Sequence, residues 1–342
     1  MSTLLREESV PDMHIHTVDL KPWTEVSAPD SRLKAARELV GACHTTGFVY
    51  IKNYGILASL LEEAFSWSKK FYDLGEHERS SAAHPPGSLI YRGYSKLGHE
   101  TVQPIDGEKL AGVPDYTESY GMGSDQNHEQ PNVWLEDCIL PGFRDFCLKF
   151  YAECWKTSKL ILQALALGLE LPHADYLLKF HSETENQLSL RHYPPVSESK
   201  VSSGEADRLG AHTDFDSFTL LWQDSLGGLK VKHPKAGIWI DAPPIEGTLI
   251  MNIGDVLSRW SNDYLTSTLH RVHLPPFDDS YEGESHDRVT KSRFSIPYFV
   301  APKTDTLLQC LDSPFADGQR QKHELITFQE LCRQKTEGVF KD

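Results

Sequence analysis

The chain has 342 residues, of which 39% are hydrophobic and 24% charged, a composition typical of globular proteins. Its formal net charge of -15 repels phosphate backbones, so we expect no nucleic-acid partner. No apolar run approaches the ~18 residues of a membrane span, and the first residues lack the apolar stretch of a secretory signal. We therefore expect a soluble cytoplasmic protein with no membrane partner, as a monomer or weak homodimer.

The first part of the chain is predicted to mix helices and strands. Residues 1 to about 12 form a loose tail, and the alternation over 14–20 predicts a short strand. Apolar residues at helical spacing follow Asp30, and a buried strand is expected over 47–55. A second helical stripe then runs from Leu57 to Phe71. The pattern predicts a helical and mixed N-terminal half.

Two further segments complete this half. Residues 80–132 are rich in Gly, Pro and polar residues and are predicted to be irregular, as loops that line pockets often are. A long scaffold helix is predicted near 142–168. The six cysteines are scattered without a Cys-x-x-Cys pair, so we expect buried free thiols rather than a disulfide framework.

Beyond the helix the pattern changes to short strands, many of them separated by Gly or Pro turns. Several short strands at this spacing favour a sandwich or barrel, and eight would make a jelly roll. The expected strands cover 187–193, 209–213, 218–223, 229–231, 238–240, 248–253, 267–274 and 293–300.

Three residues in this half form a candidate metal site. His212 and Asp214 stand at i and i+2, so on a strand they point from the same face. By itself His-x-Asp is a weak signal. In the strand over 267–274, His270 shares its face with apolar residues, whereas His273 lies on the other face; His270 is therefore the inward candidate. His233 lies in a polar turn and is expected to be solvated.

Two histidines and a carboxylate hold Fe(II) in many oxygenases and Zn in hydrolases, but no His-Glu-x-x-His helix supports the zinc hypothesis. Arg293 and Ser295 form a second i, i+2 pair, whose guanidinium and hydroxyl would clamp a carboxylate. Tyr193 is a candidate third donor. Arg191 shares its face and would attract a second carboxylate or pair with an acidic residue.

Together these stretches resemble the isopenicillin N synthase-like family of Fe(II)- and 2-oxoglutarate-dependent oxygenases. The resemblance spans about residues 12 to 302. Its motifs are Gly47-Phe48-Val49-Tyr50, Asn53-Tyr54-Gly55, His212-Thr213-Asp214, Gly227-Gly228-Leu229, Trp239-Ile240, Asn252-Ile253-Gly254-Asp255, Arg259-Trp260-Ser261-Asn262-Asp263, Ser267-Thr268-Leu269-His270-Arg271-Val272 and Arg293-Phe294-Ser295.

The resemblance implies a double-stranded β-helix (jelly-roll) core with flanking helices and a mixed N-terminal module. The module would cover 12–130 and the core 184–302, as one integrated unit. Fe(II), 2-oxoglutarate and O2 would be the cofactor and co-substrates. The implied catalytic metal ligands are His212, Asp214 and His270, and the implied 2-oxoglutarate residues are Arg293, Ser295 and Tyr193.

The implied enzyme hydroxylates, desaturates or rearranges a small-molecule substrate, in a pathway of secondary-metabolite type. Plant members often carry Asn where this chain has Arg191. Two alternatives stay open: an oxidase of the same fold that needs no 2-oxoglutarate, and a non-enzymatic binding protein. The candidate substrate-pocket residues are Arg191, Tyr91, Arg92, Tyr94, Phe218, Leu220 and Trp222.

Overall fold

The structure is a computed structural model that describes residues 13–86, 91–100, 115–276, 278–283, 288–316 and 320–336. The predicted tail lies outside the described residues, as do 87–90 and 101–114 of the segment predicted to be irregular.

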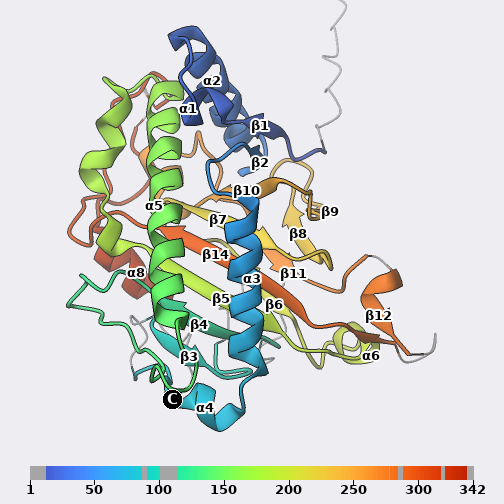
Figure 1. Cartoon of the computed structure of the whole chain (residues 1–342). Helices are drawn as coiled ribbons and strands as arrows, with labels where there is room; N and C mark the ends of the chain where they lie inside the picture. Colours follow the sequence, from blue (N-terminus) through green and yellow to red (C-terminus); the bar gives the residue numbers. More distant parts are fainter. Residues whose placement is uncertain are drawn as a thin grey trace, which may run out of the picture.

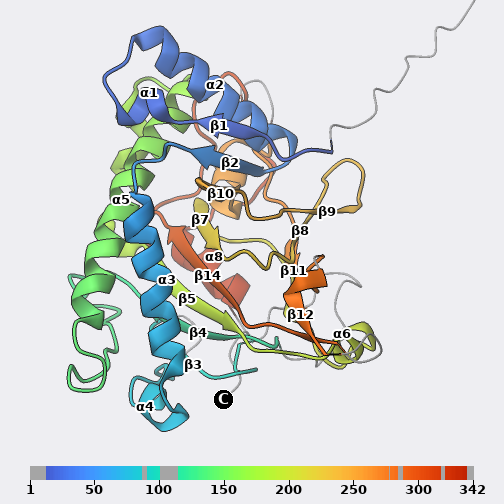
Figure 2. The same cartoon turned by 45° about the vertical axis from the view of Figure 1, so that its right-hand side comes forward.

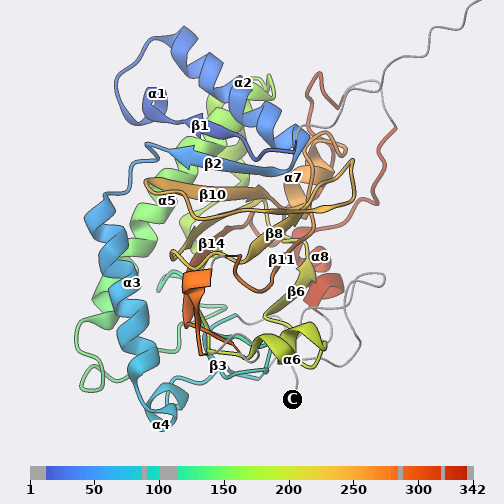
Figure 3. The same cartoon turned by 90° about the vertical axis from the view of Figure 1, so that its right-hand side faces the viewer.

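Two β-sheets form the centre of the molecule (Figures 1 and 3). Their neighbour order shows that strands far apart in sequence lie side by side, as in a jelly roll. The large sheet runs β1 (Thr17–Asp19), β2 (Phe48–Lys52), β10 (Thr248–Ile253), β7 (Phe218–Gln223), β14 (Arg293–Val300), β5 (Gln187–Tyr193), β4 (Glu118–Met122) and β3 (Gly93–Ser95). The small sheet runs β6 (Leu209–His212), β11 (His270–Val272), β8 (Leu229–Lys232) and β9 (Trp239–Asp241).

The eight strands predicted for the second half are all present, although the one over 267–274 is shortened to His270–Val272. The expectation of an irregular 80–132 segment is wrong at β3 and β4. These strands carry no β-branched residue, and what holds them is pairing: β4 adds to the edge of β5 with Ser119 opposite Arg191.

Helices cover one face of the large sheet. The predicted scaffold helix is α5 (Phe143–Gly168), which runs side by side with α3 (Ala58–Asp73) along that face (Figures 1 and 2). The predicted first helix is α2 (Pro29–Thr45). The C-terminal helix α8, which was not predicted, spans Phe328–Thr336. The shorter segments are α1 (Lys21–Thr24), α4 (Glu76–Ser80), α6 (Glu198–Ser202), α7 (Asp255–Trp260), η1 (Ala174–Phe180), η2 (Glu183–Glu185), η3 (Asp278–Ser280) and the hairpin β12 (Tyr281–Glu282) with β13 (Val289–Thr290).

The other face of the large sheet turns toward the small sheet. A cluster of buried apolar side chains joins the two, with Phe48 and Ile250 from the large sheet against Leu229 and Val231 from the small one. Because neighbouring residues of a strand point to opposite faces, β7 divides its side chains between this interior and the helices. The site occupies the remaining interior space.

All six cysteines are unpaired. The expectation of burial is right for Cys43, Cys147 and Cys154 and wrong for Cys138, which is exposed. Among the described residues, no helix is both long and apolar enough to cross a membrane. The cytoplasmic setting and the oligomeric state stay predictions.

Candidate metal and co-substrate site

The three candidate ligands converge at one end of the small sheet. His212 is the last residue of β6 and His270 the first of β11, and the two residues face each other directly across the antiparallel pair. Asp214 follows two residues after His212. The Nε2 atom of each histidine lies 3.7 Å from Asp214 Oδ1, and ligand atoms of all three residues lie within 4.8 Å of one another.

Backbone carbonyl groups orient both imidazole rings. His212 Nδ1 lies 2.9 Å from the carbonyl oxygen of Gly210, and His270 Nδ1 lies 3.1 Å from that of Thr268. A carbonyl only accepts, so each Nδ1 carries a proton and each Nε2 is left to face Asp214. Burial, with the neighbouring His270, holds the pKa of His212 well below its ordinary value, so this ring is neutral and able to bind a metal.

Asp214 is held in its ionised form. Burial alone would raise its pKa, but the facing His270 and hydrogen bonds from two side chains hold the pKa below its ordinary value. Asn252 Nδ2 donates to Oδ2 over 2.7 Å, and the Thr219 hydroxyl donates to the same oxygen. Oδ1 is thereby left to face the two imidazoles.

The Asn252-Ile253-Gly254-Asp255 motif supports this carboxylate further. The Asp255 amide donates to the Asp214 carbonyl over 2.8 Å, and the Asp255 side chain accepts from Ser267 Oγ at 2.6 Å. A Cβ atom at Gly254 would lie 2.1 Å from the carbonyl oxygen of Asp216, so only glycine fits there. The motif thus connects the segments that carry Asp214 and His270.

The predicted carboxylate clamp, Arg293 with Ser295, lies on β14 and has one hydrogen-bond donor without a partner. Arg293 Nε donates to the Gly227 carbonyl over 2.8 Å and Nη2 to Gln223 Oε1 over 3.0 Å. Its Nη1 is buried without a hydrogen-bond partner. The guanidinium lies 4.6 Å from the centre of the Tyr193 ring, and Ser295 stands two residues along the same face. An incoming carboxylate would satisfy the free Nη1.

A second buried guanidinium beside the clamp was not predicted. Arg208 is fully buried 5.6 Å from the Tyr193 ring centre, and it donates to Thr290 Oγ1 and to the Tyr193 carbonyl. Burial and the neighbouring Arg293 lower the pKa of Arg208 to about 10. Neither guanidinium forms an ion pair with a described residue. The Asp224 carboxylate attracts both without forming an ion pair, so one net positive charge of the pair favours a bound anion.

One cavity between the two sheets brings the candidate metal ligands and the carboxylate clamp together. It is lined by all six residues predicted to bind metal and co-substrate, and also by Arg191. The cavity volume open to the centres of water molecules is about 50 Å³. The donor set fits the expected groups, since two imidazoles and a carboxylate hold Fe(II) and leave positions open. The free Arg293 Nη1 fits a carboxylate.

Three of the predicted substrate-pocket residues do not line this cavity, and that expectation is corrected. Phe218, Leu220 and Trp222 point to the opposite face of β7, where the Trp222 ring lies 5.6 Å from that of Phe150 on α5. Leu221, between them, lines the cavity instead. Every residue from Phe218 to Trp222 except Thr219 is apolar, so hydrophobicity alone did not identify the inner face.

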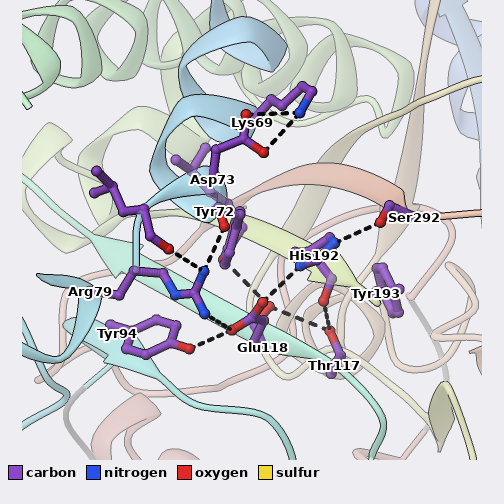
Figure 4. Close-up of polar contacts among 12 residues, drawn as sticks. Lys69, Tyr72, Asp73, Arg79, Tyr94, Thr117, Glu118, His192, Tyr193 and Ser292 are labelled. Atoms are coloured by element: carbon purple, nitrogen blue, oxygen red, sulfur yellow. Dashed lines mark hydrogen bonds and ion pairs between the residues drawn. The ribbon is translucent and has the colours of Figure 1, made fainter. Parts of the chain in front are cut away.

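Tyr94 and Arg92 also lie away from the cavity. The Tyr94 hydroxyl donates to Glu118 in a buried polar cluster on the other side of the sheet (Figure 4). In this cluster His192 Nδ1 lies 2.7 Å from the Glu118 carboxylate. His192 and Arg191 are neighbours on β5, so their side chains point to opposite faces of the sheet. Arg92 is 2% exposed and donates back to a neighbouring carbonyl. This cluster anchors β5 rather than contacting the cavity.

Three further residues considered from the sequence, Tyr91, His273 and His233, also do not line the cavity. The Tyr91 ring lies 6.2 Å from that of Phe215, the residue after Asp214, so it borders the site without lining the cavity. His273 does not line the cavity either. The expectation that His233 is solvated is wrong: it is 1% exposed, and its Nδ1 accepts the amides of Lys235 and Ala236.

Two family models match the chain. Residues 15–137 match the model described as non-haem dioxygenase in morphine synthesis N-terminal. Residues 184–302 match the 2OG-Fe(II) oxygenase superfamily model.

Relatives of known class cover nearly the whole chain. The 2-oxoglutarate-Fe(II) type oxidoreductase ppzD of Metarhizium rileyi is 34% identical over 95% of this chain and 91% of its own length. The proline hydroxylase buaE of Petromyces alliaceus is 35% identical over 86% of this chain and 90% of its own. The solved structure of a full-length Neurospora crassa protein in complex with alpha-KG and thymine has a TM-score of 0.82 and 32% identity, covering 96% of this chain and 98% of that one.

Proposed function

The chain belongs to the 2OG-Fe(II) oxygenase superfamily, and on that premise we propose that it hydroxylates, desaturates or rearranges a small molecule in a biosynthetic pathway of secondary-metabolite type. The enzyme uses Fe(II), 2-oxoglutarate and O2. The observation that carries the assignment of residues is the joint position of a two-histidine, one-carboxylate set and an unsatisfied buried guanidinium in a single cavity.

In this proposal His212, Asp214 and His270 hold the iron. The Nδ1–H bonds to carbonyl groups keep both Nε2 atoms directed inward, and the donors to Asp214 Oδ2 keep its Oδ1 directed toward the same point. These hydrogen bonds hold the three side chains in place, so little side-chain ordering remains to be done when an ion binds.

Arg293, Ser295 and Tyr193 would hold the distal carboxylate of 2-oxoglutarate. Arg293 offers its free Nη1, and Ser295 adds a hydroxyl from the same face. Arg208 lies behind this group and adds a second positive charge close to Tyr193. The positive charges favour a dianionic co-substrate over a neutral molecule of the same size.

Together Fe(II), 2-oxoglutarate and O2 supply the oxidising chemistry: 2-oxoglutarate becomes succinate and CO2, and a substrate C–H bond is oxidised. The protein residues bind, orient and exclude water. Apolar side chains from both sheets, Leu221, Leu229 and Phe299, line the cavity next to the polar groups and limit access of water to it.

The N-terminal module at 12–130 and the core at 184–302 are inferred to work as one unit. Strand β2 pairs with β10, and this places Phe48 opposite Asn252, the donor to Asp214. The Phe48 ring also lies edge-on to His270 at 5.3 Å. The N-terminal strand therefore packs directly against the proposed metal site.

The class of substrate is supported by the relatives. By its name buaE acts on proline, and the Neurospora crassa protein was crystallised with thymine. Each is a small molecule. Arg191, which lines the cavity, and Tyr91, which borders it, are the residues that we propose for substrate binding in this chain.

The test is coupled turnover. Protein loaded anaerobically with Fe(II) is given 2-oxoglutarate, O2 and a panel of amino acids, cyclic dipeptides and pyrimidines, and succinate and oxidised product are quantified together. Equal amounts of the two are expected, and none with His212→Ala. Absence of succinate throughout would refute the proposal, and turnover without 2-oxoglutarate would favour an oxidase.

A further inference from the structure

Arg191 is a second cavity guanidinium that is only half satisfied. It lies on β5, between Ser119 of β4 and Ser295 of β14 in register. Its Nη2 lies 3.3 Å from Glu100 Oε2, whereas its Nη1 is buried and makes no hydrogen bond. Since this side chain lines the same cavity as the metal trio, one N–H group remains for a ligand.

The charge of Arg191 is already balanced. Glu100 forms the ion pair, and the Ser119 hydroxyl donates to the other Glu100 oxygen, which keeps the carboxylate in place. Burial would lower the pKa of Arg191, but Glu100 and other neighbours outweigh it and the pKa is raised, so the pair stays ionised. Arg293 and Arg208 differ, because neither forms an ion pair with any described residue.

This difference separates two kinds of subsite. The unpaired cations, Arg208 and Arg293, fit an anion, and the proposed function already gives them one in 2-oxoglutarate. A carboxylate at Arg191 would instead add a negative charge next to Glu100, and like charges in a low-dielectric cavity repel strongly. A carbonyl group takes the free N–H without adding charge.

We propose that Arg191 recognises the substrate through a neutral carbonyl acceptor, as in an amide, lactam or imide, and that free carboxylic acids are disfavoured. This rests on the proposed function, since it places the substrate next to the metal trio. Ser295 pairs with Arg191 and Arg293 with Tyr193. The acceptor subsite therefore lies beside Ser295 and about 7 Å along the sheet from Arg293 and Tyr193.

The test measures binding to the anaerobic Fe(II)–2-oxoglutarate complex of the full chain, whose visible absorbance responds when a molecule enters the site. The probes are three matched pairs that differ in one group: benzamide and benzoate, cyclohexanecarboxamide and cyclohexanecarboxylate, N-acetylprolinamide and N-acetylproline. Each amide should bind about tenfold or more tightly than its acid. Acids that bind as tightly as the amides, or no binding by any amide, would overturn the proposal.

Two variants separate recognition from general damage. Arg191→Met should abolish the preference for amides while the Kd for 2-oxoglutarate stays within about twofold of wild type. Glu100→Gln removes the balancing charge, so it should shift the preference toward the acids. Three results would each contradict the assignment. The preference for amides could survive in Arg191→Met, or Glu100→Gln could keep the wild-type preference. Arg191→Met could also lose 2-oxoglutarate binding.

The inference and the proposed function fail in different ways. If the wild-type protein gives no absorbance band with Fe(II) and 2-oxoglutarate, the proposed function fails. If the band forms and the amide and acid probes bind alike, the co-substrate site stands and the substrate class alone is wrong.

Discussion

Asn252 offers a direct way to weaken the metal site without removing a ligand. Its amide donates to Asp214 Oδ2 over 2.7 Å, and the residue is 2% exposed. Asn252→Leu keeps the approximate size of the side chain and removes the donor. Asp214 is then left with Thr219 as its only side-chain donor among the described residues.

The expected loss follows from the strength of that bond. A hydrogen bond to a charged group contributes about 1.5–3 kcal/mol, and loss of a partner that orients a metal ligand commonly weakens metal binding about ten- to a hundredfold. Burial would then raise the pKa of Asp214, so a proton would also compete better with the metal. Both effects weaken Fe(II) binding at neutral pH.

The assay is an anaerobic Fe(II) titration of wild type, Asn252→Leu and a matched control, Asn186→Leu. Asn186 is also fully buried and hydrogen-bonded, to Ser182 and Ala301, but it contacts no member of the trio. The control should lose stability and keep its Fe(II) affinity. If Asn252→Leu binds Fe(II) as tightly as wild type, or if both variants weaken equally, the support role of Asn252 is refuted.

Three further predictions concern other groups. Arg208→Met should raise the Kd for 2-oxoglutarate about tenfold or more without loss of thermal stability, because it removes an unpaired buried cation; an unchanged Kd by titration would count against it. Burial lowers the pKa of His181 to about 4, so the unfolded chain takes up the proton first and the free energy of unfolding should fall by about 3 kcal/mol as pH falls from 6.5 to 4. In urea unfolding of His181→Gln, the free energy of unfolding should depend less steeply on pH than in wild type. An identical dependence would refute this. Asp255→Asn loses its 2.7 Å ion pair with Lys335 and weakens the hydrogen bonds that its carboxylate accepts from Thr213 and Ser267 in the segments of Asp214 and His270, so Fe(II) affinity should fall about tenfold, with unaltered affinity as the contrary result.

Strand phase accounts for the part of the site that could be predicted. Residues two apart on a strand share a face, and this rule selected His270 over His273 and paired Arg293 with Ser295. The structure brings His270, Arg293 and Ser295 into one cavity, which His273 does not line. The rule needs only local sequence, and it works when one face carries polar residues that the other lacks.

The same rule did not identify the inner face of β7. Apolar residues occupy both of its faces, because one packs on α5 and the other lines the cavity. Arg208 was missed for a related reason, since a single arginine in sequence carries no sign that it is buried. The β3–β4 pair was missed because its partner strand lies far along the chain, and pairing with β5 rather than propensity forms it.

The role of the metal trio is tested most directly by iron stoichiometry in two histidine variants from the same segment. Wild type and His273→Ala should each bind one Fe(II) per chain anaerobically and develop the visible absorbance of an Fe(II)–2-oxoglutarate complex. His270→Ala should lose both while its far-ultraviolet circular dichroism stays that of wild type. Stoichiometric iron in His270→Ala, or its loss in His273→Ala, would contradict the assignment of the site.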